Sequence, residues 1–123
     1  IAISCEVGPE VIYGSTRMKS GTSQKMILNL FSTTLMIKQG RTFGNLMSHM
    51  RVTNEKLKDR ALRIVMEATN CEVEEAQKAL CQTENKIPVA ILHILSSASI
   101  DSCWREFHSA DECIRIALKN LGG

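Results

Sequence analysis

The spacing of apolar and polar residues divides the chain into a strand-like beginning, one strongly apolar helix and a series of amphipathic helices. Residues 1–4 and 6–13 are short apolar runs, the second interrupted by Gly8 and Pro9, as in strands of a sheet buried on both faces. Residues 14–22 form a polar turn between glycines. Residues 23–39 then carry apolar side chains all round a helix, which must be covered on most sides.

The middle of the chain predicts a loop followed by an amphipathic helix. Gly40 is suited to end the first helix, and residues 40–47, with a second glycine at Gly44, have the composition of a connecting loop. Asn70 is suited to the left-handed residue that ends the next helix, over residues 54–69. The apolar stripe of that helix consists of Leu57, Ala61, Ile64, Val65 and Ala68.

Residues 70–123 predict a small helical domain, with helices over 72–83, 88–97 and 109–120 and a turn around 101–107. Pro88 fits a first helical turn, and Ser109 and Glu112 have the spacing of a capping box. The expected core consists of Val73, Ala76, Leu80, Ile91, Leu92, Leu95, Trp104 and Leu118. We place the boundary with the preceding part near residues 47–54.

Composition changes this picture little. The 123 residues are 44% hydrophobic and 23% charged, as in an ordinary globular protein. The net charge of +2 comes from 15 basic and 13 acidic residues mixed along the chain, and aromatic residues make up only 4%, so no nucleic-acid partner is expected. No signal peptide and no apolar run near the ~20 residues of a membrane span are apparent, so we expect a cytoplasmic protein without a membrane partner.

Sulfur-containing residues indicate packing rather than chemistry. The five cysteines are Cys5, Cys71, Cys81, Cys103 and Cys113. Their odd number and wide spacing favour reduced thiols, although Cys71 with Cys81, or Cys103 with Cys113, is spaced for a short disulfide loop. The six methionines occupy core-like positions and are interpreted as packing residues: Met18, Met26, Met36, Met47, Met50 and Met66.

The turn at residues 14–22 is the clearest candidate site. It lacks the Gly-Lys-Ser/Thr order of a Walker nucleotide loop, but it places hydroxyls and two cations just before a long helix, where an anion is favoured. The alternative is an ordinary capped turn. Glu10 is either a carboxylate with a raised pKa, suited to acid or base work, or an ion-pair partner of Arg17 or Lys19.

Histidine spacing adds no catalytic or metal site. His49, His93 and His108 share no pattern with Asp, Glu or Cys that would hold a metal or activate a nucleophile, so each is expected at the surface or its boundary.

Several sequence runs resemble N-acetylmuramic acid 6-phosphate etherases. The most specific is VGPEVIYGSTRMKSGTSQK over residues 7–25, continued by GRTFGNLM over 40–47. TNEKL over 53–57 and IVMEATNC over 64–71 extend the resemblance into the amphipathic helix, and EEAQKAL over 74–80 extends it into the helical domain. The similarity therefore spans about the whole chain and weakens after Ser97.

The resemblance implies a mainly α chain in three parts: residues 1–47 as the C-terminal piece of a doubly wound α/β sugar isomerase domain, 48–69 as a hinge helix, and 70–123 as a small UBA-like helical domain. It implies a lyase that cleaves the D-lactyl ether of N-acetylmuramic acid 6-phosphate by elimination and then hydration. A homodimer, a phosphorylated amino sugar as partner, and no metal or organic cofactor are expected with it.

The resemblance also assigns residues. Glu10, Ser15, Thr16, Arg17 and Lys19 fall on the motif beside the sugar cleft, so substrate positioning is expected of them. The family's serine loops for phosphate and its two glutamates proposed as acid and base lie upstream of the matching region, so no catalytic residue is assigned and this chain alone is expected to be inactive. The alternative is a non-catalytic phosphosugar-binding module, because glucokinase regulatory protein is similar to this family.

Overall fold

A computed structural model describes residues 2–122. The chain divides into two compact units, with the boundary in the sequence between Ile37 and Lys38. The described residues form six helices and one two-stranded hairpin, so the expected mainly α character is confirmed. The relation of the first part to a doubly wound α/β domain, the UBA-like character of the last part and the three-part division stay predictions.

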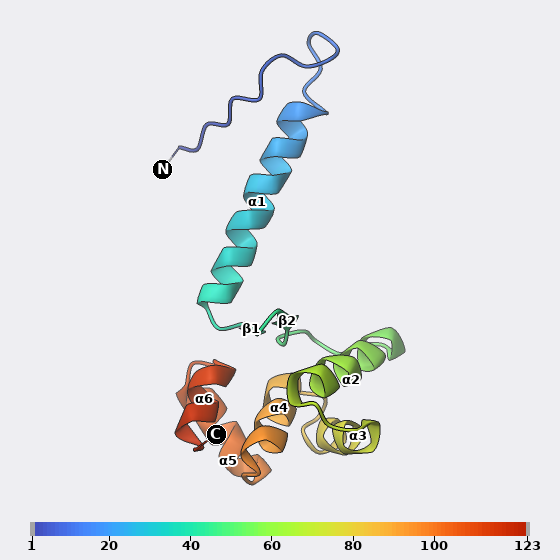
Figure 1. The fold of residues 1–123 in the computed structure, drawn as a ribbon, viewed down its shortest axis with the longest axis vertical. Coiled ribbons are helices and arrows are strands. Elements are labelled where there is room, and N and C mark those ends of the chain that lie inside the picture. Colours follow the sequence, from blue (N-terminus) through green and yellow to red (C-terminus); the bar gives the residue numbers. More distant parts are fainter. Residues whose placement is uncertain (1, 123) are drawn as a thin grey trace. The chain divides into compact units, whose positions relative to one another are not determined.

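The first unit contains one helix, α1 (Lys19–Lys38), preceded by a chain segment without regular structure (Figure 1). The strands expected over residues 1–4 and 6–13 are absent from residues 2–13. A strand persists only where a neighbouring strand satisfies its backbone groups, and no strand among the described residues pairs with this segment. The prediction of strands is therefore wrong for this chain; residue 1 lies outside the described part.

Helix α1 begins four residues before its expected start at Ser23 and ends where Gly40, with φ of 71°, was expected to end it. None of its residues is buried. Leu30 and Phe31 remain 71% and 65% exposed, so the cover expected for this apolar helix is not supplied within the described chain. Four methionines expected in a core are also exposed: Met18, Met26, Met36 and Met47.

A small antiparallel hairpin replaces the loop expected over residues 40–47. Strands β1 (Thr42–Phe43) and β2 (Leu46–Met47) pair Thr42 with Met47 and Phe43 with Leu46. Gly44, with φ of 58°, and Asn45 form the connecting turn. A Gly-Asn pair between two short apolar runs is a known hairpin signal, so the sequence carried the information that the loop interpretation missed.

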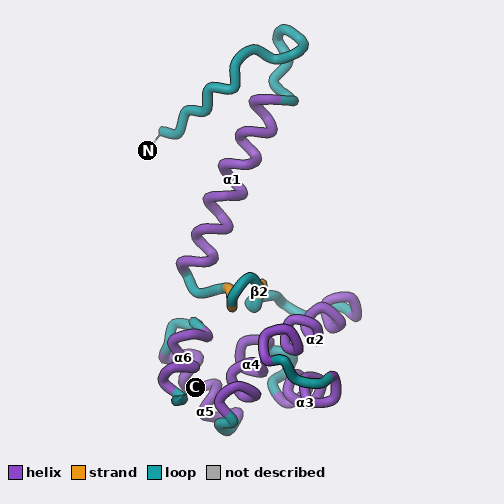
Figure 2. The backbone as a smooth tube through the Cα atoms, viewed as in Figure 1, coloured by secondary structure: helices purple, strands orange, loops and turns teal. Residues whose placement is uncertain are grey.

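Five helices form the core of the second unit (Figure 2). Their bounds are α2 (Glu55–Thr69), α3 (Val73–Gln82), α4 (Ile87–Ser96), α5 (Ile100–Ser109) and α6 (Ile114–Asn120). Helix α4 contacts all four of the others, and its Ile91 and Leu92 are fully buried. The expected amphipathic helix over 54–69 is confirmed, with Asn54 as its N-cap and Asn70 in the left-handed conformation.

The expected core is confirmed except for Val73 and Leu95. Ala76, Leu80, Ile91 and Leu92 are buried, and Trp104 and Leu118 pack partly against them. Val73 and Leu95 are more than a third exposed. Met50 and Met66 pack against the same core as expected, and Pro88 lies in the first turn of α4.

The predicted capping box is wrong. Residues 101–107, expected as a turn, belong to the ten-residue helix α5, which extends to Ser109. Ser109 therefore ends one helix instead of beginning the next, and its hydroxyl donates to the Glu106 carbonyl. Glu112 has a left-handed backbone, and its side chain binds Arg41, which removes it from any cap of α6.

All five cysteines are free, as expected, but only Cys103 is buried, and that burial raises the pKa of its thiol. Among residues 2–122, no single helix is long and apolar enough to cross a membrane. Helices α4 and α5 together have the required length and composition, but they are bent by 117° relative to each other.

Candidate functional site

Glu10 binds the first turn of α1 from nine positions upstream. Its Oε1 accepts hydrogen bonds from the backbone N–H of Lys19 (3.1 Å) and of Ser20 (3.0 Å), and its Oε2 accepts one from Lys19 (3.0 Å). A helix start carries unpaired N–H groups and partial positive charge, which favour a carboxylate there. Glu10 is thus an internal cap for α1, and this cap explains why the helix starts at Lys19.

The bonds from Lys19 and then Ser20 lower the pKa of Glu10 below its ordinary value. This finding contradicts the raised pKa considered from the sequence. It also differs from the ion-pair alternative, because the carboxylate is held by backbone N–H groups. A carboxylate stabilised in its charged form is poorly suited to accept or donate a proton near neutral pH.

The remaining N–H groups of the first turn of α1 are also occupied. Gly21 N–H donates to the carbonyl of Thr16 (2.9 Å), and Thr22 N–H donates to that of Met18 (3.2 Å). All four N–H groups that a helix start offers to an anion therefore have partners within the chain. The backbone of residues 14–22 therefore matches the capped-turn interpretation. An anion at this turn would be bound by side chains, because the backbone N–H groups are already occupied.

The five predicted site residues gather around this helix start in two kinds of position. Glu10 and Lys19 hold the loop, since the Lys19 ammonium donates to the Pro9 carbonyl (2.9 Å). Ser15, Thr16 and Arg17 lie on the loop between them, with Thr16 and Arg17 exposed and Ser15 half-buried. The hydroxyls and the guanidinium are consequently the groups that remain available to a ligand.

A second polar cluster, which the sequence analysis missed, joins the hairpin region to the turn between α5 and α6. Arg41 forms an ion pair with Glu112, and His49 Nε2 lies 2.9 Å from the Glu112 carbonyl. Because a carbonyl only accepts, Nε2 carries the proton and donates it. In the neutral ring His49 Nδ1 then accepts from the Ser48 hydroxyl at 3.0 Å. No local sequence motif predicts the Arg41–Glu112 ion pair, because the two residues are 71 positions apart in the chain.

The cluster has a defined charge state. Burial lowers the pKa of His49, against the opposing effect of the bond to Glu112, so the ring is neutral at pH 7. The Arg41 guanidinium lowers the pKa of Glu112, with a smaller contribution from Lys86. The expectation of His49 as a surface or boundary residue is confirmed in position, but its role as a cross-link was not foreseen.

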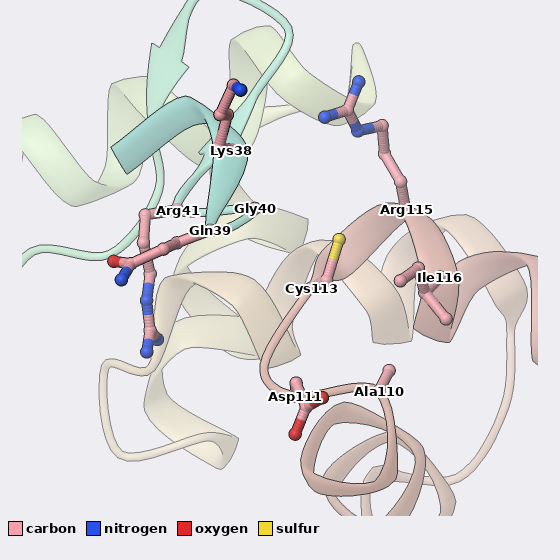
Figure 3. Close-up of a pocket in the computed structure, with 9 residues that line it drawn as sticks. All are labelled: Lys38, Gln39, Gly40, Arg41, Ala110, Asp111, Cys113, Arg115 and Ile116. Atoms are coloured by element: carbon pink, nitrogen blue, oxygen red, sulfur yellow. The ribbon is translucent and has the colours of Figure 1, made fainter. Parts of the chain in front are cut away.

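A hollow of about 650 Å³ lies beside this cluster, between residues 38–41 and residues 110–116 (Figure 3). Lys38 and Arg115 extend to one side of it with the Cys113 thiol between them, whereas Arg41 and Asp111 point away from that side. Gly40 also lines the hollow and packs closely on Cys113, since an added Cβ at residue 40 would lie 2.7 Å from Cys113 Sγ. No three His, Cys, Asp or Glu side chains among residues 2–122 are grouped to hold a metal ion.

Comparison with known proteins identifies relatives of this chain. An N-acetylmuramic acid 6-phosphate etherase of Vibrio campbellii is 46% identical over 120 residues, which cover 98% of this chain and 39% of that protein. Etherases of the same name from Clostridium botulinum and Pectobacterium atrosepticum are 47% and 45% identical, covering 97% and 100% of this chain and 40% of each relative. The chain is homologous to the C-terminal part of these etherases. No protein-family model matches the sequence.

The etherase homology covers both polar sites but only part of the relatives. The chain spans about two fifths of the length of the etherases it matches. The match to the Pectobacterium etherase extends over all 123 residues, so it includes the Glu10 loop and the Arg41–Glu112 cluster. The predicted resemblance to the C-terminal part of these etherases is thereby confirmed, whereas the roles of individual loop residues stay predictions.

Proposed function

We propose that this chain is the supporting C-terminal part of a lyase that cleaves the D-lactyl ether of N-acetylmuramic acid 6-phosphate by elimination and then hydration. The observation that carries the proposal is the 45–47% identity to N-acetylmuramic acid 6-phosphate etherases over nearly the whole chain. A cytoplasmic location and a homodimeric state belong to the same proposal, as do a sugar isomerase-like first part and a UBA-like last part.

The loop before α1 supplies substrate contacts in this proposal. Ser15, Thr16 and Arg17 meet oxygens of the sugar phosphate, because their side chains lie on the loop while the helix N–H groups are already bound. Glu10 and Lys19 position that loop through their bonds to the helix start and to Pro9. An Arg guanidinium is well suited to a phosphate, since two N–H groups pair with two oxygens.

One observation favours a second candidate, a non-catalytic phosphosugar-binding module. The carboxylate nearest the loop is an internal cap with a lowered pKa, so the described loop offers groups for binding but none for proton transfer. In the first proposal the acid and base come from elsewhere in the enzyme. The two candidates therefore differ in whether the chain supports turnover when joined to the rest of an etherase.

The deciding experiment measures D-lactate release from N-acetylmuramic acid 6-phosphate. Two proteins are compared: this chain alone, and the Vibrio campbellii etherase in which this chain replaces the homologous C-terminal part. We expect release from the chimera and none from the chain alone. A folded chimera, checked by circular dichroism and gel filtration, that binds the sugar phosphate without releasing D-lactate would favour the binding module.

A further inference from the structure

The hollow beside the Arg41–Glu112 cluster is formed by residues of the second unit and carries two cations without a carboxylate partner. Among residues 2–122, ion pairs join only Arg41 to Glu112 and Lys58 to Glu55. The exposed side chains of Lys38 and Arg115 extend to the same side of the hollow (Figure 3). Their charges are therefore available to a ligand.

The other charged groups at the hollow do not cancel these two cations. Arg41 is occupied by its ion pair with Glu112. Asp111, the one carboxylate among the described residues that line the hollow, points away from the side that holds Lys38 and Arg115. The C-terminal end of α1, where Lys38 lies, carries a partial negative charge that opposes an anion. The charges of both side chains are therefore needed to favour an anion here.

The uncharged lining of the hollow suits the carbon skeleton of a small organic anion. Ile116, which is 52% exposed, and Ala110 give the hollow an apolar wall. The Cys113 thiol lies between the two cations (Figure 3). The volume of about 650 Å³ falls within the range of about 300–1,000 Å³ that is usual for small-molecule sites. The hollow therefore combines a cationic edge with an apolar wall.

We infer that this hollow binds a small phosphate monoester, with Lys38 and Arg115 on the phosphate and Ile116 against the carbon skeleton. A phosphate ester carries about −1.5 to −2 charges at pH 7, so it matches two cations better than a single carboxylate does. The Arg115 guanidinium is suited to pair with two phosphate oxygens, and the Lys38 ammonium adds a point charge. The site goes beyond the proposed function, because none of these three residues belongs to the loop assigned to the substrate.

The test is the rate at which neutral iodoacetamide alkylates Cys113 in the whole chain, measured by mass spectrometry of the tryptic peptide that contains it. Cys81, exposed on α3, is the internal control. We expect saturating glucose 6-phosphate to slow alkylation of Cys113 about fivefold or more, because the occupied form is shielded. Glucose should have no effect, and inorganic phosphate should protect only at higher concentration, since it lacks carbons to contact Ile116.

Variants of the two cations test the electrostatic part, each compared with its own alkylation rate without ligand. Lys38→Gln or Arg115→Gln should raise the half-protecting concentration of glucose 6-phosphate about two- to fivefold, because exposed charges contribute modestly. The double variant should abolish protection. Lys119→Gln removes a cation from the same helix as Arg115 but outside the hollow, and it should leave protection unchanged. Circular dichroism checks that each variant stays helical.

A second readout does not depend on thiol reactivity. In ¹⁵N NMR spectra the backbone N–H signal of Gly40 should shift with glucose 6-phosphate, whereas that of Gly44, in the hairpin turn, should not. Three results would overturn the site: no change at either Cys113 or Gly40, equal slowing of Cys81 and Cys113, or an effect of Lys119→Gln as large as that of Arg115→Gln. Equal protection by inorganic phosphate would assign the hollow to free phosphate and contradict the ester.

Discussion

Glu10 and Glu112 are carboxylates that hold distant parts of the chain together. Glu10 binds the start of α1, and Glu112 binds Arg41 and, through its carbonyl, His49. Each has a pKa below its ordinary value because its partners favour the charged form. At both sites the carboxylate stabilises the position of the backbone segment it binds. Any ligand would therefore be bound by other side chains near it.

Gly40 should be sensitive to a single added methyl group. Its φ of 71° costs a residue with a Cβ about 1–2 kcal/mol, and that Cβ would also lie 2.7 Å from Cys113 Sγ. Gly44 has a similar φ of 58° but no atom within 4 Å of the corresponding position. We expect Gly40→Ala to lower the free energy of unfolding more than Gly44→Ala in urea denaturation. Equal losses would contradict the close packing of residue 40 on Cys113.

The neutral His49 predicts a loss of stability in mild acid. Its pKa in the folded chain lies below the ordinary 6.5, so the unfolded chain binds more protons as the pH falls below that value. The free energy of unfolding should therefore fall between pH 6.5 and the lower folded pKa, and Glu112 adds a further loss below its ordinary pKa of 4.5.

The matched variant for this pH dependence is His49→Gln, whose amide does not titrate. Because His93 and His108 are present in both proteins, the difference between the two stability curves isolates residue 49. We expect the variant to be less dependent on pH near pH 6 in urea titrations. Identical slopes would exclude His49 as the source.

At the scale of elements, residues within and around each helix decide where it begins and ends. Asn54 accepts from Leu57 N–H at 2.9 Å, and Asn70 closes α2 in the left-handed conformation. The cap of α1, in contrast, comes from Glu10, outside the turn that precedes it. Local caps are visible in a sequence, whereas caps from distant residues are not.

Removing the local cap of α2 should cost a moderate amount of stability. Asn54→Ala deletes the acceptor of the Leu57 N–H bond, and such losses usually cost about 0.5–2 kcal/mol. Asn54→Asp keeps an acceptor at the same place and should remain close to the original protein. Chemical denaturation of both variants is the measurement, and a loss from Asp as large as that from Ala would contradict the capping role.

The same distinction explains what the sequence predicted. The helices α2, α3 and α4 were predicted within one or two residues, because their apolar stripes and their Asn or Pro signals are local. The prediction of strands within residues 1–13 was wrong because a strand depends on neighbouring strands that pair with it. In the candidate site, the loop residues were chosen from their chemistry and from the resemblance, and their role stays a prediction. The use of Glu10 as a cap and the Arg41–Glu112 pairing depend on contacts across the fold, so neither was predicted.

At the scale of the whole molecule, the two units differ in how they satisfy their apolar residues. The unit from Lys38 onward buries a continuous core around α4, including Phe107 and Ile114. The unit up to Ile37 contains no buried residue in the part of α1 that it includes. Stability of the chain alone should therefore come from the second unit.

Residues 38–123, made as a separate protein, should unfold cooperatively on heating. Phe107 is fully buried, so Phe107→Ala should cost about 3–5 kcal/mol. Ile116 is 52% exposed, and Ile116→Ala should change the free energy of unfolding by about 0.5 kcal/mol or less. Calorimetry of the three proteins is the measurement, and a broad transition without cooperativity would show that this unit needs the rest of the chain.

The most direct test of the whole account is the rate of D-lactate release by the Vibrio campbellii chimera that carries this chain, with and without Arg17→Ala. Loss of a charged hydrogen bond to phosphate costs about 1.5–3 kcal/mol, so we expect an active chimera in which Arg17→Ala raises KM about tenfold or more. Lys25→Ala, on the same unit, should leave KM unchanged. A folded chimera without activity would contradict the role of this chain as the supporting part of an etherase, and an active chimera whose KM is the same with Arg17→Ala would contradict the substrate contact of its loop.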